Sequence, residues 1–100
     1  MSEGLGPVGS KSALAITAPT LLDTTGVSSY TPRRISHVHV LVAGVTLGSV
    51  NDAATVAAAA AGNLVYNVPN TVGIYLVDFP MILGIVVTPG TGQTLSVSYD

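Results

Sequence analysis

The chain has 100 residues, of which only 8% are charged, whereas an average soluble domain carries about 25%. Its net charge of −2 and its three cations, Lys11, Arg33 and Arg34, exclude the basic cluster that binds nucleic acid. The absence of cysteine excludes disulfides and thiol chemistry. Because so charge-poor a surface is most simply explained when other protein covers it, we expect an assembly component.

The sequence also contains no candidate membrane-spanning segment. No apolar run approaches the roughly 20 residues that a spanning helix needs, and the first residues lack the basic and apolar regions of a secretory signal. We therefore expect a protein made in the cytoplasm and used without crossing a membrane by that route.

The first third of the chain predicts an arm followed by strands. Residues 1–10, with three glycines and Pro7, indicate a flexible N-terminal arm, and residues 11–100 indicate one folded domain. Residues 12–17 predict a first strand that alternates Leu14 and Ile16 with small side chains. Beyond Pro19, residues 20–25 predict a continuation along a sheet edge, because proline cannot donate to a ladder.

The strongest strand pattern runs from Arg34 to Ala43. Alternation predicts two faces: one carries Val38, Val40 and Val42, and the other carries Ile35, His37, His39 and Leu41. A return strand is expected between Val45 and Val50. The alanine-rich residues 53–61 fit a short helix capped by Asn51 or Asp52 and by Gly62, or a tight loop with one helical turn.

The remainder predicts further short strands separated by turns. Strands are expected at residues 63–68 and 72–78, with a break at Pro80 and a strand buried on both faces at residues 82–88. Residues 89–92 predict a turn with positive φ at Gly90. In the last strand, Leu95, Val97 and Tyr99 are expected to face inward. Seven or eight short antiparallel strands predict an all-β fold, a single-domain β-sandwich of jelly-roll type or a small barrel.

His37 and His39 are the candidate metal ligands. Their spacing places both imidazoles on one side of a strand, about 6–7 Å apart, which is how some zinc and iron sites begin. A third ligand would have to come from carboxylates that lie at no recognisable spacing: Glu3, Asp23, Asp52, Asp78 and Asp100. We therefore favour a half-covered face or a pH-sensitive subunit contact over a metal site, and expect no cofactor.

Catalytic patterns are missing as well. The chain has no Gly-x-Ser-x-Gly elbow, and its acids are too scattered to form a catalytic pair. Asp23 and Asp52 are expected to cap turns, and Asp78 to end a strand. These observations favour a non-enzymatic protein.

Three stretches carry a resemblance to a known group of proteins. They are HVLVAGVTLGSVNDAAT, VPNTVGIYLVDFP and GIVVTPGTGQTLSVSYD, within residues 34–100. The chain resembles small virion proteins of tailed bacteriophages, most specifically in the turns at residues 69–73 and 89–93. The resemblance implies a capsid cement or decoration protein on the exterior of the virion, or a head-fibre or tail-attachment piece. It also implies a β-sandwich, commonly trimeric, whose partners are further copies and the major capsid protein.

Two alternatives remain beside a cement protein. A fibre component that binds a host surface or glycan would need exposed aromatic side chains, for which Tyr30 and Tyr66 are the candidates. A metal-dependent enzyme would be built on His37 and His39. For the cement protein, the expected partner contacts are Ser2, Glu3, Leu5, Pro7, Arg33, Arg34, His37 and His39.

Overall fold

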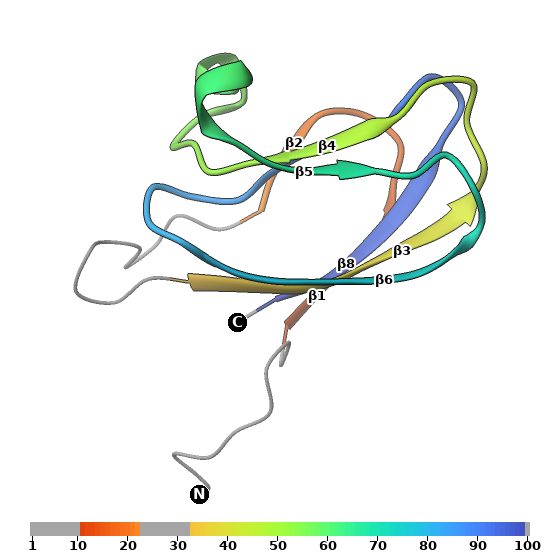
Figure 1. The fold of residues 1–100 in the computed structure, drawn as a ribbon, viewed down its shortest axis with the longest axis horizontal. Coiled ribbons are helices and arrows are strands. Elements are labelled where there is room, and N and C mark those ends of the chain that lie inside the picture. The colour runs from red at the N-terminus through yellow and green to blue at the C-terminus, as the bar shows by residue number, and fades with distance from the viewer. Residues whose placement is uncertain (1–10, 23–32, 100) are drawn as a thin grey trace, which may run out of the picture.

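Two antiparallel sheets packed face to face make up the computed structural model of this protein (Figure 1). The structure describes residues 11–22 and 33–99, and these form eight strands. The first sheet has the order β1-β8-β3-β6, with bounds Lys11–Ile16, Thr94–Tyr99, Arg33–Val42 and Gly73–Met81. The second sheet has the order β2-β7-β4-β5, with bounds Thr20–Leu21, Val86–Thr88, Gly48–Asn51 and Leu64–Val68.

The strand pairing follows a nested pattern. Strand β1 pairs with β8, β2 with β7, β3 with β6 and β4 with β5, all antiparallel. The chain is therefore one long hairpin folded over on itself, which is the topology of a jelly roll. The expected all-β sandwich of jelly-roll type is confirmed.

Aliphatic side chains from both sheets fill the space between them. Because successive strand residues point to opposite faces, alternate positions supply the core. As expected, Leu95, Val97 and Tyr99 of β8 point inward, as do Val38 and Val40 of β3. The remaining core residues are Ile16, Ile35, Val50, Val68, Met81, Ile85 and Val87.

A bulge in β3 makes part of the predicted division of that strand into two faces wrong. The register with both neighbouring strands shifts between Ile35 and His37. Because the extra residue reverses the alternation, Ile35 is buried with Val38 and not on the side of His37. The pairing with β8 shifts again between Val40 and Val42, and Val42 is half exposed, so the prediction that it shares one face with Val38 is wrong as well.

A second irregularity lies in β1. The pairing with β8 shifts between Ala13 and Ile16, and Ala15 has a φ of 54°. Strict alternation would place Leu14 and Ile16 on one face. Instead Ile16 is buried in the core and Leu14 is exposed on the opposite side of the sheet.

The alanine-rich segment after β4 is the tight loop and not the α-helix. It contains two single-turn 3-10 helices, η2 (Val56–Ala58) and η3 (Ala61–Asn63), neither with a buried residue. The cap is Thr55, whose Oγ1 accepts a hydrogen bond from the Ala58 amide at 3.1 Å, rather than Asn51 or Asp52. No helix within residues 11–22 and 33–99 is long and apolar enough to span a bilayer.

Pro80 and Asp78 lie inside β6, so the predicted strand end at these residues is wrong. Strand β6 is at the edge of the first sheet, which is where a strand tolerates proline. Asp78 has a φ of 45° and marks an irregular point of the strand. Of the expected buried strand at residues 82–88, only Val86–Thr88 is strand, and Ile82 and Leu83 are exposed.

The last turn is displaced by one or two residues from its predicted place. The Gln93 amide donates to the Gly90 carbonyl at 3.0 Å, and the positive φ falls at Gly92, at 76°, instead of at Gly90. Gly90 is needed for a different reason: a Cβ there would overlap the backbone of Thr46 in the β3–β4 loop.

Candidate interaction surfaces

The outer face of the first sheet carries large apolar side chains that no other part of the described chain covers. Leu14 on β1 is 73% exposed, and Ile74 and Leu76 on β6 are 68% and 67% exposed. The outer face is the set of side chains that point away from the core: Ser12, Leu14, Ser96, Ser98, His37, His39, Ile74 and Leu76. Ser96 is the buried member of this set, and its Oγ accepts a hydrogen bond from the Ala15 amide at 3.2 Å. A monomer in water gains nothing from this arrangement, because it leaves apolar area hydrated.

The two imidazoles lie side by side on this outer face. Their ring centroids are 6.4 Å apart and their planes are almost perpendicular, at 89°. The expected placement on one side of a strand is confirmed. His37 Nδ1 lies 2.7 Å from the hydroxyl of Ser36, which orients that ring.

The described neighbours of the imidazoles supply no third metal ligand. Across the strands, His37 is opposite Leu76 and Ser98, and His39 is opposite Ile74 and Ser96. Neither neighbouring strand brings a carboxylate to the pair. In the described part of the chain, no group of three histidine, aspartate or glutamate side chains gathers around one point.

Arg34 is paired within its own chain. Its Nη1 donates to Asp78 Oδ1 at 2.9 Å and to the Asp78 carbonyl at 3.3 Å. This exposed pair joins β3 to β6 and balances one charge with another at the β6 edge. The other expected contacts, Ser2, Glu3, Leu5, Pro7 and the side chain of Arg33, lie outside the described residues.

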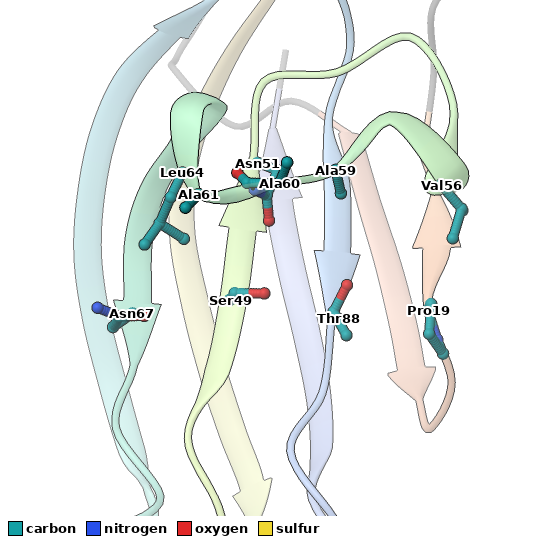
Figure 2. A pocket seen from close by; sticks show the side chains of 10 residues that line it. All are labelled: Pro19, Ser49, Asn51, Val56, Ala59, Ala60, Ala61, Leu64, Asn67 and Thr88. Carbon is teal, nitrogen blue, oxygen red and sulfur yellow. The ribbon is translucent and has the colours of Figure 1, made fainter.

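A shallow hollow of about 410 Å³ lies on the outer side of the second sheet. Figure 2 shows Ser49, Asn67 and Thr88 on its floor and Ala59 to Ala61 crossing above them. The loop is held in place by Asn51, whose Nδ2 donates to the Ala60 carbonyl at 2.9 Å and to Asn63 Oδ1 at 2.8 Å.

The lining of this hollow offers only neutral groups. It consists of two hydroxyls, two side-chain amides and small or aliphatic side chains: Ser49, Thr88, Asn51, Asn67, Pro19, Val56, Ala59, Ala60, Ala61 and Leu64. No acid, base or imidazole is among them, so the hollow has no group to activate a nucleophile or transfer a proton. It also has no aromatic ring on which a sugar could stack.

The remaining candidates have structural roles or lie outside the described residues. The carboxylate of Asp52 accepts hydrogen bonds from the amides of Ile82, Leu83 and Gly84, at 2.7–3.3 Å, so the expected turn cap is confirmed. Tyr66 packs against the core, which removes it as an exposed aromatic contact. Asp23 and Tyr30 fall outside the described residues.

The exposed apolar residues of β6 were not among the predicted contacts. Their signal is present in the sequence, because Ile74 and Leu76 alternate with Tyr75 and Val77, so that both faces of the strand are apolar. A strand of that kind is covered on both sides. Among residues 11–22 and 33–99, a covering layer exists on one side only, where Tyr75 and Val77 pack against the core.

Comparison of the chain with models of protein families, with curated proteins and with solved structures finds no match.

Proposed function

We propose that this protein is a non-enzymatic structural subunit of a tailed-bacteriophage particle, a cement protein that binds the exterior of the capsid at seams between capsomers. The observation that carries the proposal is the uncovered outer face of the first sheet. It combines strongly exposed Leu14, Ile74 and Leu76 with hydroxyl and imidazole groups and has no unpaired charge in its centre.

Such a face suits the closing of a protein seam. Covering a leucine or isoleucine that is about two-thirds exposed contributes about 1–2 kcal/mol. Serine hydroxyls are cheaper to desolvate than carboxylates or ammonium groups. On a repeating lattice, many weak contacts of this kind add up through multivalency.

The fold and the sequence resemblance support the same class of protein. Jelly rolls occur in viral capsid domains as well as in lectins and cupins, so the fold alone is an argument by analogy. The hollow is lined by neutral groups, and the imidazole pair has no third ligand among the described residues. Both features favour a capsid protein over a lectin or a cupin. The resemblance of residues 34–100 to phage virion proteins points in the same direction.

The test uses particles produced from the genome that encodes this chain. Quantitative mass spectrometry of purified particles should find the protein in a fixed ratio to the major capsid protein. Particles made without it should lose their DNA at a lower temperature and recover on addition of the purified chain. Particles that lack the protein while its gene is expressed would overturn the proposal.

The N-terminal arm, residues 1–10, allows a second test of the same proposal. A variant without residues 2–10 should fold as the full chain does and bind deficient particles more weakly. The circular dichroism spectrum of the variant serves as the control for folding. Equal binding by the two proteins would remove the arm from the attachment surface.

A further inference from the structure

The two imidazoles of β3 are carried by a fixed backbone. Strand β3 lies between β8 and β6 in the first sheet, so hydrogen-bonded neighbours on both sides hold its residues in place. His37 and His39 are two positions apart, and both are half-buried on the outer face. The sheet therefore positions the two side chains before any ligand arrives, which lowers the entropy lost on binding.

The separation of the two rings is close to the separation that a shared metal ion requires. Their centroids are 6.4 Å apart. An ion bound at about 2.1 Å to one nitrogen of each ring, with a tetrahedral angle between the two bonds, needs centroids about 5 Å apart. Rotation of each χ1 by about 15–20° closes this gap within one rotamer well, and the broad χ2 of histidine lets a nitrogen of each ring turn toward the ion.

Ser36 holds the other nitrogen of His37. Its hydroxyl, on a residue that is only 2% exposed, lies 2.7 Å from His37 Nδ1. When Nδ1 carries the ring proton, it donates to this hydroxyl and leaves the Nε2 lone pair free for a metal ion. Histidine ligands of metals nearly always have their second nitrogen held by such a partner, which fixes the tautomer and the orientation of the ring. The buried serine is therefore an observation, independent of the ring spacing, that points to a metal ligand.

The surroundings of the pair leave room for the other ligands of such an ion. A small hollow of about 80 Å³ adjoins His39, and Ser12 and Ser98 are among the residues that line it. Two waters fit into this volume, since each takes about 30 Å³ in the liquid. The hydroxyls of Ser12 and Ser98 have no partner among the described residues, so they can accept hydrogen bonds from these waters. The residues opposite the pair on β6 and β8 are all neutral, so no cation there repels a metal ion.

We propose that His37 and His39 form a chelating pair for one divalent transition-metal ion, whose remaining coordination positions are filled by water. Imidazole suits Zn²⁺, Ni²⁺ and Cu²⁺, whereas Mg²⁺ and Ca²⁺ require oxygen ligands. Because no described carboxylate lies at the pair, the site selects the first group of ions over the second. Structural and catalytic zinc sites have three or four protein ligands. An ion held by two is therefore exchangeable.

The chain allows a direct test, because these are its only two histidines. Isothermal titration calorimetry of the full chain, prepared without a purification tag, should show one Ni²⁺ bound per chain. His37→Gln and His39→Gln should each raise the dissociation constant for Ni²⁺ at least about tenfold, because a single imidazole cannot chelate. Titration with Mg²⁺ should show no binding, because the pair offers no oxygen ligand of its own.

The matched control keeps two histidines in the chain but separates them. In the double variant His39→Gln/Val45→His, the second imidazole moves to the β3–β4 loop, where Val45 is 79% exposed. This variant should bind Ni²⁺ as weakly as His39→Gln alone. Ser36→Ala should weaken Ni²⁺ binding about tenfold. In the Zn²⁺-loaded chain, ¹⁵N NMR should place the ring proton of His37 on Nδ1, which a merely structural role of Ser36 would not require. Thermal unfolding of each variant verifies that it is folded.

This inference goes beyond the proposed function and does not depend on it, because every measurement uses the isolated chain. No binding below millimolar Ni²⁺, or equal binding by the wild-type chain and the control His39→Gln/Val45→His, would overturn the chelating pair. One ion per two chains would mean that the ion is shared between copies, and would equally overturn a site formed within one chain. A chain that binds Ni²⁺ through both histidines but is absent from phage particles would support the pair and contradict the cement role.

Discussion

Gln93 is the buried polar residue that connects the β7–β8 turn with the β5–β6 loop. Its side chain is 1% exposed. Its Oε1 accepts a hydrogen bond from the Gly90 amide at 2.9 Å, and its Nε2 donates to the Pro69 carbonyl at 2.9 Å. One side chain therefore joins the turn before β8 to the loop that follows β5.

Replacement of Gln93 by leucine should cost about 2–3 kcal/mol of folding free energy. The volumes are similar, so no large cavity forms, but the Gly90 amide and the Pro69 carbonyl lose their partner. An unsatisfied buried group costs about 1–3 kcal/mol. Because Gly90 and Pro69 are only half buried, a value near the lower end, about 1–1.5 kcal/mol, applies to each of the two groups. For a domain of this size the melting temperature should fall by about 10–20 °C.

The assay is urea unfolding followed by circular dichroism at one fixed protein concentration, because self-association shifts apparent stability. The control is Thr20→Val, which removes an exposed hydrogen bond from the Thr20 hydroxyl to the Ala18 carbonyl. This change should lower the free energy of unfolding by less than about 0.5 kcal/mol. A Gln93→Leu variant as stable as the Thr20→Val variant would refute the role assigned to the buried amide.

Two further changes test other parts of the molecule. Asp52→Ala should lower the free energy of unfolding, measured with urea, by about 1–3 kcal/mol, because three turn amides lose their carboxylate acceptor. Asp52→Asn keeps one acceptor oxygen and should lower the free energy of unfolding by a smaller amount. Gly90→Ala should destabilise the fold by at least about 2 kcal/mol in the same assay, because its methyl group meets the backbone of Thr46, and an unchanged midpoint would contradict that close approach.

Sequence periodicity was sufficient for the regular parts of the fold. Strand β8 alternates without interruption, and its inward residues, Leu95, Val97 and Tyr99, were predicted correctly. The β-branched composition and the regular spacing of turn residues likewise predict a sandwich. These features depend on the order of apolar, polar and turn residues over short stretches, which can be read directly from the sequence.

The bulges and the tertiary hydrogen bonds could not be predicted in the same way. Nothing in the sequence around Ile35 or Ile16 indicates that an extra residue reverses the alternation there, because a bulge is chosen by the pairing with a distant strand. Pro80 was expected to break a strand, because the sequence does not show that its strand lies at a sheet edge, where proline is tolerated. The buried role of Gln93 is also set by segments far away along the chain.

The candidate surface was predicted in part. The histidine pair on one side of a strand followed from spacing alone. The apolar neighbours on β1 and β6 did not, because Leu14 changed sides at the β1 irregularity and β6 could have been covered on both faces. The composition of the face depends on which strands are neighbours, and the neighbours are set by the jelly-roll order.

The nested hairpin also determines how the chain reaches its folded state. The pair β4–β5 joins segments close in sequence, whereas β1 pairs with β8 between Lys11 and Tyr99, almost the whole length of the chain. Contacts between such distant segments pay a large loop-closure entropy, which makes folding slow, on the scale of milliseconds to seconds. Closure should proceed outward from β4–β5, with β1 added last. During that interval the free edge of β8 can accept the β1 strand of a second chain, so high concentration during refolding should favour strand-exchanged dimers.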